Sequence, residues 1–167
     1  MEAFEAVRTV LAVRRYRAEP LQEATVRRIV EAGRLTASSM NLQPWHFVVV
    51  QDRRTLARLG GIARTGRYVA EAPLAIAVAV ERTRFAVSDA SRAIQSMMLT
   101  AWAEGVGSNW IGFVMPAVND VLGIPAELDV LALVSFGYPG ARLGRGKKQR
   151  KPLGDVASRE RYGTPFE

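Results

Sequence analysis

The spacing of apolar residues predicts alternating helices and strands in the first third of the chain. Apolar side chains recur every three or four positions over residues 4–11 and again over residues 22–34, which predicts two amphipathic helices. Residues 47–51 form a short apolar run rich in valine, which predicts a short buried strand. A brief helix is expected over residues 54–59, closed by Gly60-Gly61.

The same reasoning covers the rest of the chain. The expected elements are a central strand over residues 74–80, a helix from Ser88-Asp89 to Gly105, a short helix from Pro116 to Gly123 and a strand over residues 130–136. Helices and buried strands alternate irregularly, so we expect the α+β class, with a small mixed or largely antiparallel sheet flanked by helices. Residues 1–167 are expected to form a single domain.

The tail has a different character. From Gly140 onward the chain is basic, rich in glycine and without helical period, but it retains scattered large apolar residues. These are Leu153, Val156, Tyr162 and Phe166. We therefore expect residues 140–167 to form an extended arm that docks on another surface.

A polar stretch between the second helix and the first strand is the main candidate for a site. Ser38, Ser39, Asn41 and Gln43 offer neutral hydroxyl and amide groups at close spacing. Such groups suit a ligand rich in hydroxyls, carbonyls and ring nitrogens, because its polar atoms must be matched when water is removed. A plain serine and asparagine turn between a helix and a strand accounts for the same residues equally well.

A second candidate is the glycine-rich segment of residues 105–113. Its glycines would let the backbone approach a flat ligand without obstruction by side chains. The end of a helix is the alternative explanation.

Composition narrows the possible chemistry. The chain has no cysteine and one histidine, His46, which excludes disulfides, thiol redox chemistry and a histidine-rich metal site. His46 is expected to be packed or hydrogen-bonded rather than catalytic. Redox activity would therefore need a bound cofactor. There is no targeting signal and no apolar run near the roughly 20 residues that span a bilayer, so we expect a cytoplasmic protein without a membrane partner.

Charge points to an anionic partner. The formal net charge is +7, and the basic residues gather in two clusters. The first comprises Arg14, Arg15 and Arg17, and the second Arg142, Arg145, Lys147, Lys148, Arg150 and Lys151. Nucleic acid and the phosphate of a cofactor are both possible partners. Nucleic-acid binding would require interleaved exposed aromatics or a recognition helix, and we expect neither in these clusters.

Several motifs occur in a specific order and spacing. They are Phe4-Glu5, Val7-Arg8, Val13-Arg14-Arg15-Tyr16, Ser38-Ser39-x-Asn41-x-Gln43-Pro44-Trp45-His46-Phe47, Asp89 through Ala93-x-Gln95-x-Met97, Gly105-Val106-Gly107-Ser108, Leu122-Gly123-Ile124-Pro125, Gly137-Tyr138-Pro139 and Lys148-x-Arg150-x-Pro152-Leu153. Together they resemble the nitroreductase family of FMN-dependent oxidoreductases over nearly the whole chain.

The resemblance implies a domain-swapped homodimer with two FMN sites at the subunit interface. NADH or NADPH would donate a hydride to FMN, and a small aromatic acceptor such as a nitroaromatic or quinone would then be reduced by a ping-pong mechanism. The flavin would carry the redox chemistry, so no catalytic side chain and no metal are expected.

The resemblance also assigns roles to individual residues. Arg14, Lys148 and Arg150 would hold the FMN phosphate, with Arg15 and Tyr16 beside them. Ser38, Ser39, Asn41 and Gln43 would come from the other subunit. The backbone of Trp110, Ile111 and Gly112 would lie beside the flavin ring and offer an amide to N5.

Some positions depart from the family pattern. The usual Arg-x-Ser element before Arg14 is Val10-Leu11-Ala12, so Arg15 or Arg8 would have to compensate. Ala37 and Met40 stand where the family usually has proline and glycine. The chain also lacks the length for a helical insertion that often covers the substrate. Two other functions remain open: a specialised flavin reaction, such as flavin fragmentation or reductive dehalogenation, and a basic binding module without redox turnover.

Overall fold

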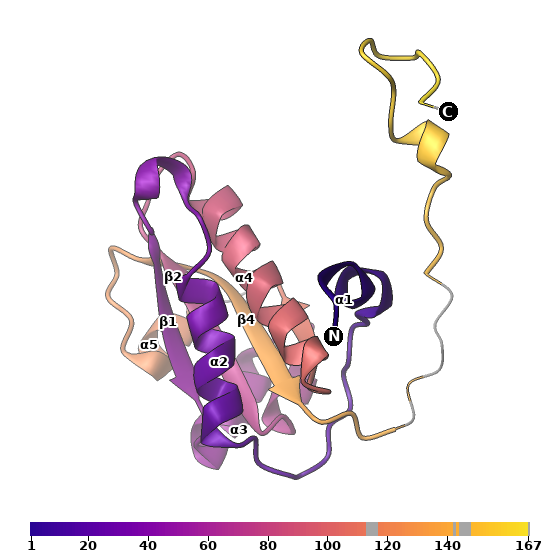
Figure 1. The fold of residues 1–167 in the computed structure, drawn as a ribbon. Coiled ribbons are helices and arrows are strands. Elements are labelled where there is room, and N and C mark those ends of the chain that lie inside the picture. The colour runs from indigo at the N-terminus through magenta and orange to yellow at the C-terminus, as the bar shows by residue number, and fades with distance from the viewer. Residues whose placement is uncertain (113–116, 142, 144–147, 167) are drawn as a thin grey trace.

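A computed structural model of the chain describes residues 1–112, 117–141, 143 and 148–166. Figure 1 shows the arrangement of the helices and strands. In chain order they are α1 (Ala3–Thr9), α2 (Glu23–Arg34), the 3-10 turn η1 (Ser39–Asn41), β1 (Trp45–Val50), α3 (Arg53–Ile62), η2 (Arg67–Ala70), β2 (Leu74–Val80), α4 (Ala86–Ala103), β3 (Gly107–Ile111), α5 (Ala117–Leu122), β4 (Asp129–Gly137) and η3 (Leu153–Asp155).

The described strands form one antiparallel sheet in the order β1-β2-β4-β3. Thus β2 and β4 are central, and β1 and β3 are the outer strands. The expected α+β class with a small antiparallel sheet is confirmed.

Strand β2 explains why the domain has three layers. Its even-numbered residues, from Leu74 to Val80, pack with side chains of α2 and α4. Its odd-numbered alanines pack on the other face, with side chains of α3 and α5. Because neighbouring side chains of a strand point to opposite faces, a strand covered on both sides is apolar at every position. Figure 1 shows α2 and α4 lying together over one face of the sheet.

The pair of helices over that face packs closely. Helix α4 buries Ala90, Ile94, Met97 and Ala101, which follow a spacing of three or four residues. On α2, a Cβ at Gly33 would lie 3.1 Å from the Met97 side chain, so glycine allows the two helices to approach.

The glycine-rich segment after α4 contains a strand that the sequence did not predict. Gly105 ends α4 with a φ of +78°, and Gly107–Ile111 then pairs with β4 as β3. A Cβ at Gly107 would lie 2.4 Å from a methyl group of Val13, so this glycine lets residues 10–17 pack against β3. The predicted segment also included Phe113, which lies outside the described residues.

Several predicted boundaries were wrong. The glycines at positions 60 and 61 lie inside α3, and Gly60 packs against Ala70 of η2. Helix α4 begins at Ala86, before the predicted Ser88 cap. The predicted start of the short helix, Pro116, lies outside the described residues. Its predicted end is confirmed, because Gly123 follows α5 with a φ of +64°.

Two elements are less buried than predicted. Strand β1 begins two residues earlier than expected and is only partly buried, because it is an outer strand. Helix α1 ends at Thr9, and its Phe4 and Val7 side chains are exposed.

The segment of residues 148–166 runs away from the helical layers (Figure 1). Its Leu153, Val156 and Tyr162 side chains are exposed to solvent. What this segment docks on stays a prediction. Among the described residues, no helix is long and apolar enough to cross a membrane, and no group of histidines and carboxylates could hold a metal ion.

Candidate functional site

The first basic cluster lies at one edge of the sheet. The Val13 amide donates to the Ser108 carbonyl of β3 at 2.9 Å, and the Gly140 amide donates to the Arg15 carbonyl at 2.9 Å. These bonds hold residues 10–17 along the start of β3 and the end of β4. Arg14 and Arg15 are exposed there, where an anion can reach them.

Tyr16 anchors this segment from inside. Its hydroxyl donates to the Val13 carbonyl at 2.6 Å and lies 2.7 Å from Ser135 Oγ of β4. Burial raises the pKa of Tyr16 well above its usual range, so the phenol stays protonated. The hydroxyl is therefore used within the chain, and Tyr16 serves to position its arginine neighbours.

The second basic cluster meets helix α1. Lys148 Nζ donates to the Val7 carbonyl at 2.9 Å. Partial burial, together with the positive charges of Arg150 and Arg8, lowers the pKa of Lys148. Desolvation is the larger cause, and the repulsion from Arg150 and Arg8 adds to it. A bound anion would relieve this repulsion. Arg8 is also held by Glu5, through bonds of 2.8 and 2.7 Å. Arg8 was predicted only as a substitute for the missing Arg-x-Ser element.

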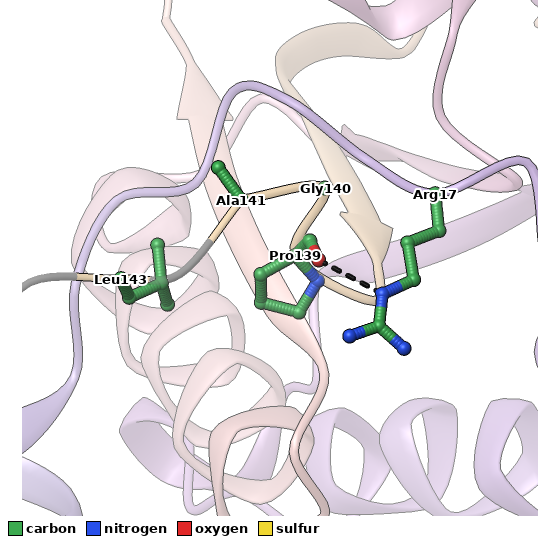
Figure 2. Close-up of a pocket in the computed structure, with 5 residues that line it drawn as sticks. All are labelled: Arg17, Pro139, Gly140, Ala141 and Leu143. Carbon is green, nitrogen blue, oxygen red and sulfur yellow. Dashed lines mark hydrogen bonds between the residues drawn. The ribbon is translucent and has the colours of Figure 1, made fainter.

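A hollow of about 450 Å³ lies beside the first basic cluster (Figure 2). Its lining residues are Arg17, Pro139, Gly140, Ala141 and Leu143. Arg17 Nε donates to the Pro139 carbonyl at 3.2 Å, while the other two guanidinium nitrogens point away from this carbonyl. Arg17 was noted for its charge but was not among the predicted site residues.

The polar stretch between α2 and β1 is tied to the start of α4. The backbone amide and the hydroxyl of Ser39 both donate to the Asp89 carboxylate, each at 3.0 Å. Ser38 Oγ accepts from the Gln43 amide at 2.8 Å, and Gln43 Nε2 donates to the carbonyl and the side chain of Asn41, both at 3.2 Å. The predicted polar residues therefore form one hydrogen-bonded unit.

The backbone of this unit is unusual. Met40, Asn41 and Gln43 have φ values of +51°, +56° and +49°, in the left-handed region that favours glycine. Strained backbone of this kind is frequent at functional sites.

Asp89 is the site residue that the sequence did not reveal. The sequence marked it as a helix start and as part of a family motif but gave it no role in the site, whereas its side chain is completely buried. Burial alone would raise its pKa, but hydrogen bonds from Ser39 and Arg92 outweigh that effect and hold the pKa below its usual range. The carboxylate is therefore ionised at neutral pH. Asp89 bonds Ser39, which lies 50 residues earlier in the sequence. The local spacing of residues does not reveal such a long-range pairing.

The third predicted group, the backbone of Trp110, Ile111 and Gly112, lies at the outer edge of the sheet along β3. The Ser108 carbonyl points away from β4, because it accepts from Val13. Since the amide and carbonyl of one residue point to the same side and alternate along a strand, the Trp110 amide also points to the outer edge. Trp110 is partly buried, Ile111 is buried in the core, and Gly112 is exposed. The backbone, and not the Ile111 side chain, is what this edge can offer to a ligand.

The predicted site residues fall at opposite corners of the sheet. The Ser38–Gln43 unit lies where β1 begins, beside the Val80 end of β2, whereas Arg14 lies beyond the Leu74 end. The two ends of β2 are about 20 Å apart, and the two outer strands about 14 Å apart. Helices cover both faces between these corners. One chain therefore does not bring the two groups together.

Comparison with known proteins identifies the family. The sequence profile of the nitroreductase family matches residues 8–67 and 64–138. The chain belongs to the nitroreductase family. One relative is an Archaeoglobus fulgidus protein, provisionally named NADH dehydrogenase/NAD(P)H nitroreductase. It is 32% identical to this chain, and the match covers 83% of this chain and 86% of the relative. The 5,6-dimethylbenzimidazole synthase of Rhodospirillum rubrum is 30% identical over 76% of this chain and 77% of its own.

Solved structures of nitroreductase-family proteins share the fold. A provisionally named nitroreductase from Desulfovibrio desulfuricans, solved in complex with FMN, has a TM-score of 0.83 and 28% identity, and the match covers 97% of this chain and 98% of that one. A Parabacteroides distasonis protein, provisionally named NADH dehydrogenase/NAD(P)H nitroreductase, has a TM-score of 0.86 over 96% of this chain and 98% of its own. Its identity is 23%, so it supports the nitroreductase fold alone.

Proposed function

We propose that this protein is an FMN-dependent NAD(P)H oxidoreductase that works as a homodimer, with each flavin site shared by two subunits. The observation that carries the proposal is the separation of the two polar groups at opposite corners of the sheet. Covered faces prevent one flavin from joining them within a chain, whereas a second copy can bring its own Ser38–Gln43 unit to the basic corner. The FMN complex of the Desulfovibrio desulfuricans relative supports the choice of cofactor.

The available groups fit FMN. Arg14, Lys148 and Arg150 would hold the phosphate, with Arg8 and Arg15 adding positive charge. Crowding of cations around Lys148 favours this role, because a dianion neutralises it. The Trp110 amide on the open edge of β3 would hold N5 of the ring.

The partner's polar unit would complete the site. Ser38, Ser39, Asn41 and Gln43 from the second subunit would hydrogen bond the ribityl chain and the ring. Tyr16 would act indirectly, by fixing the backbone that carries Arg14 and Arg15.

The chemistry follows from this arrangement. FMN, when bound, would supply the redox chemistry that passes a hydride from NADH or NADPH to a small aromatic acceptor such as a nitroaromatic or quinone. The side chains of this chain bind and orient, so the absence of cysteine and the single histidine are no obstacle. Donor and acceptor would use the same pocket in turn, which gives ping-pong kinetics.

The cofactor is tested by the absorption spectrum of the purified protein, with the released chromophore identified by chromatography. We expect about one FMN per chain, at two sites per dimer. NADH and NADPH oxidation with a quinone or nitroaromatic then tests the reaction. A colourless protein that takes up no added FMN would refute the proposal.

The shared site has a sharper test. Arg14→Glu and Ser38→Trp each disable one half of a site, and each variant alone should bind little FMN. After unfolding and refolding together, random pairing should restore about a quarter of the sites, because every mixed dimer has one intact site. If each site belonged to a single chain, mixing would restore none. Thermal unfolding of each variant shows whether it is folded before mixing.

A specialised flavin reaction is the second candidate. The observation that favours it is the similarity to the Rhodospirillum rubrum protein named 5,6-dimethylbenzimidazole synthase. Incubation of the reduced holoenzyme with oxygen, followed by product analysis, separates the two candidates. Intact FMN after many turnovers supports the oxidoreductase, whereas loss of flavin with formation of a benzimidazole supports the synthase reaction.

A further inference from the structure

The proton of the Ser39 hydroxyl has a definite location. A serine hydroxyl has one proton to donate and two lone pairs that accept. Ser39 Oγ lies 3.0 Å from Asp89 Oδ1, and the ionised carboxylate of Asp89 can only accept. The Ser39 proton is therefore committed to Asp89, and the hydroxyl presents only lone pairs to any other group.

Ser38, the neighbouring serine, has the opposite hydrogen-bonding role. Ser38 Oγ accepts from the Gln43 amide at 2.8 Å, so one of its lone pairs is used. Among the described residues, its proton goes to no protein group. Ser38 can therefore donate to a ligand, whereas Ser39 can only accept from one.

Asp89 is built to keep this polarity. Its side chain is completely buried at the start of α4 and holds both the amide and the hydroxyl of Ser39. Arg92 pairs with the same carboxylate. The backbone that follows Ser39 is left-handed at Met40 and Asn41, so these bonds also hold a strained segment in place.

We propose that Asp89 is a positioning residue that fixes Ser39 as a hydrogen-bond acceptor toward the flavin, so that Ser39 takes a ribityl hydroxyl or the ring N–H while Ser38 takes an acceptor atom. This inference rests on the proposed function, because the ligand is the flavin. Asp89 itself does not touch the cofactor and acts through Ser39.

Asp89→Asn tests the polarity. With its oxygen in the place of Oδ2, an asparagine still accepts from the Ser39 amide, and its amide nitrogen takes the place of Oδ1. There the nitrogen faces Ser39 Oγ as a donor and can no longer accept from Arg92. Ser39 Oγ then accepts a hydrogen bond from the new side-chain amide, and its own hydroxyl proton is released. That proton would face the donor hydrogen of the ligand, and the two would repel. We expect the FMN dissociation constant of the full-length protein to rise roughly three- to tenfold, the range of one neutral hydrogen bond. FMN fluorescence during titration measures the binding.

A double-mutant cycle separates this role from a general loss of structure. Ser39→Ala should weaken FMN binding by a similar factor, and Asp89→Asn should weaken it little further in the Ser39→Ala background. Ser39→Thr keeps the hydroxyl and should restore the affinity. Asp129→Asn is the matched control, since Asp129 also forms an ion pair with an arginine, Arg82, at 2.9 Å, but its carboxylate is not the one that Ser39 bonds. FMN affinity should be unchanged in this control.

The outcomes are distinct. Equal FMN affinity in the wild type, Ser39→Ala and Asp89→Asn would overturn this inference and leave the proposed function standing. Independent, additive losses from Ser39→Ala and Asp89→Asn would also overturn it. If Asp89→Asn fails to fold, equal FMN affinity of Ser39→Ala and Ser39→Thr would still overturn the inference, because Asp89 acts through the Ser39 hydroxyl. Failure of the wild type to bind FMN would instead remove the proposed function.

Discussion

At the residue scale, the left-handed backbone of Met40 is the most informative feature. A residue other than glycine in this conformation costs about 1–2 kcal/mol. The Met40 side chain is 76% exposed, so burial within its own chain does not offset that cost. In the proposed dimer, this side chain lies in the segment that meets the partner. Contact there would explain why an apolar residue stands at a position where glycine would be less strained.

The strain at Met40 can be measured. Met40→Gly should raise the free energy of unfolding of the protein without flavin by roughly 0.5–1 kcal/mol, because relief of left-handed strain exceeds the entropy cost of glycine. Leu42→Gly is the control, since Leu42 has a φ of −70° and carries no such strain. This control should lower the stability. Urea denaturation measures both changes, and a destabilised Met40→Gly would show that the contacts of the Met40 side chain outweigh the strain.

At the element scale, the docking of residues 10–17 on β3 depends on a glycine. Gly107 leaves no space for a Cβ beside Val13, and the neighbouring Val13 amide bonds the Ser108 carbonyl. The same segment carries Arg14 and Arg15. A change at Gly107 should therefore affect both stability and the proposed phosphate site.

Gly107→Ala should lower the free energy of unfolding by about 1–3 kcal/mol, the usual cost of overpacking. It should also weaken FMN binding, because it displaces the arginines. Adding Val13→Ala should recover only part of the stability, because it removes the two Val13 methyl groups but leaves the Val13 Cβ, 2.7 Å from the new methyl group. Gly61→Ala is the control, because a Cβ at Gly61 contacts nothing within 4 Å and alanine favours a helix. Chemical denaturation and FMN titration of the four proteins give the comparison.

The elements differ in how far the sequence could predict them. Strands β2 and β4 were predicted because their apolar runs reflect burial on both faces of the sheet. Strand β3 was missed because Gly107, Ser108 and Asn109 have low strand propensity, and pairing with β4 overrides it. Gly60 suggested a helix end, but it lies inside α3. A glycine stands there because a Cβ would lie 2.6 Å from Ala70 Cβ.

The site shows the same division. The residues of the Ser38–Gln43 unit could be nominated from local composition and family motifs. Their connection to Asp89 could not, because it joins residues 50 positions apart and appears only when η1 packs against α4. The crowding of Arg8 with Lys148 was also hidden, because 140 residues separate them in sequence.

At the scale of the whole molecule, large apolar side chains are exposed to solvent near both termini. Phe4 and Val7 of α1 are exposed, as are Leu153, Val156 and Tyr162 of the C-terminal segment. These side chains gain nothing from the three-layer core. In the proposed homodimer, the C-terminal segment would be the extended arm and would cover the partner.

Removal of residues 152–167 tests that role. The truncated subunit should keep its fold, because the three-layer core does not use these residues. The dimer should dissociate more readily, so the melting temperature should fall and depend more strongly on protein concentration. Analytical ultracentrifugation and thermal unfolding over a range of concentrations measure these effects. An unchanged dimer would show that the arm does not bind the partner.

The two halves of the proposed flavin site lie at opposite corners of the sheet, and this placement has a genetic consequence. If each flavin site takes one half from each copy, a chain damaged in both halves spoils both sites of every dimer it enters. A cell that makes intact and doubly damaged chains in equal amounts would then keep only about a quarter of its flavin sites, and not half. The damaged allele would be dominant without any change in how well its product folds or pairs.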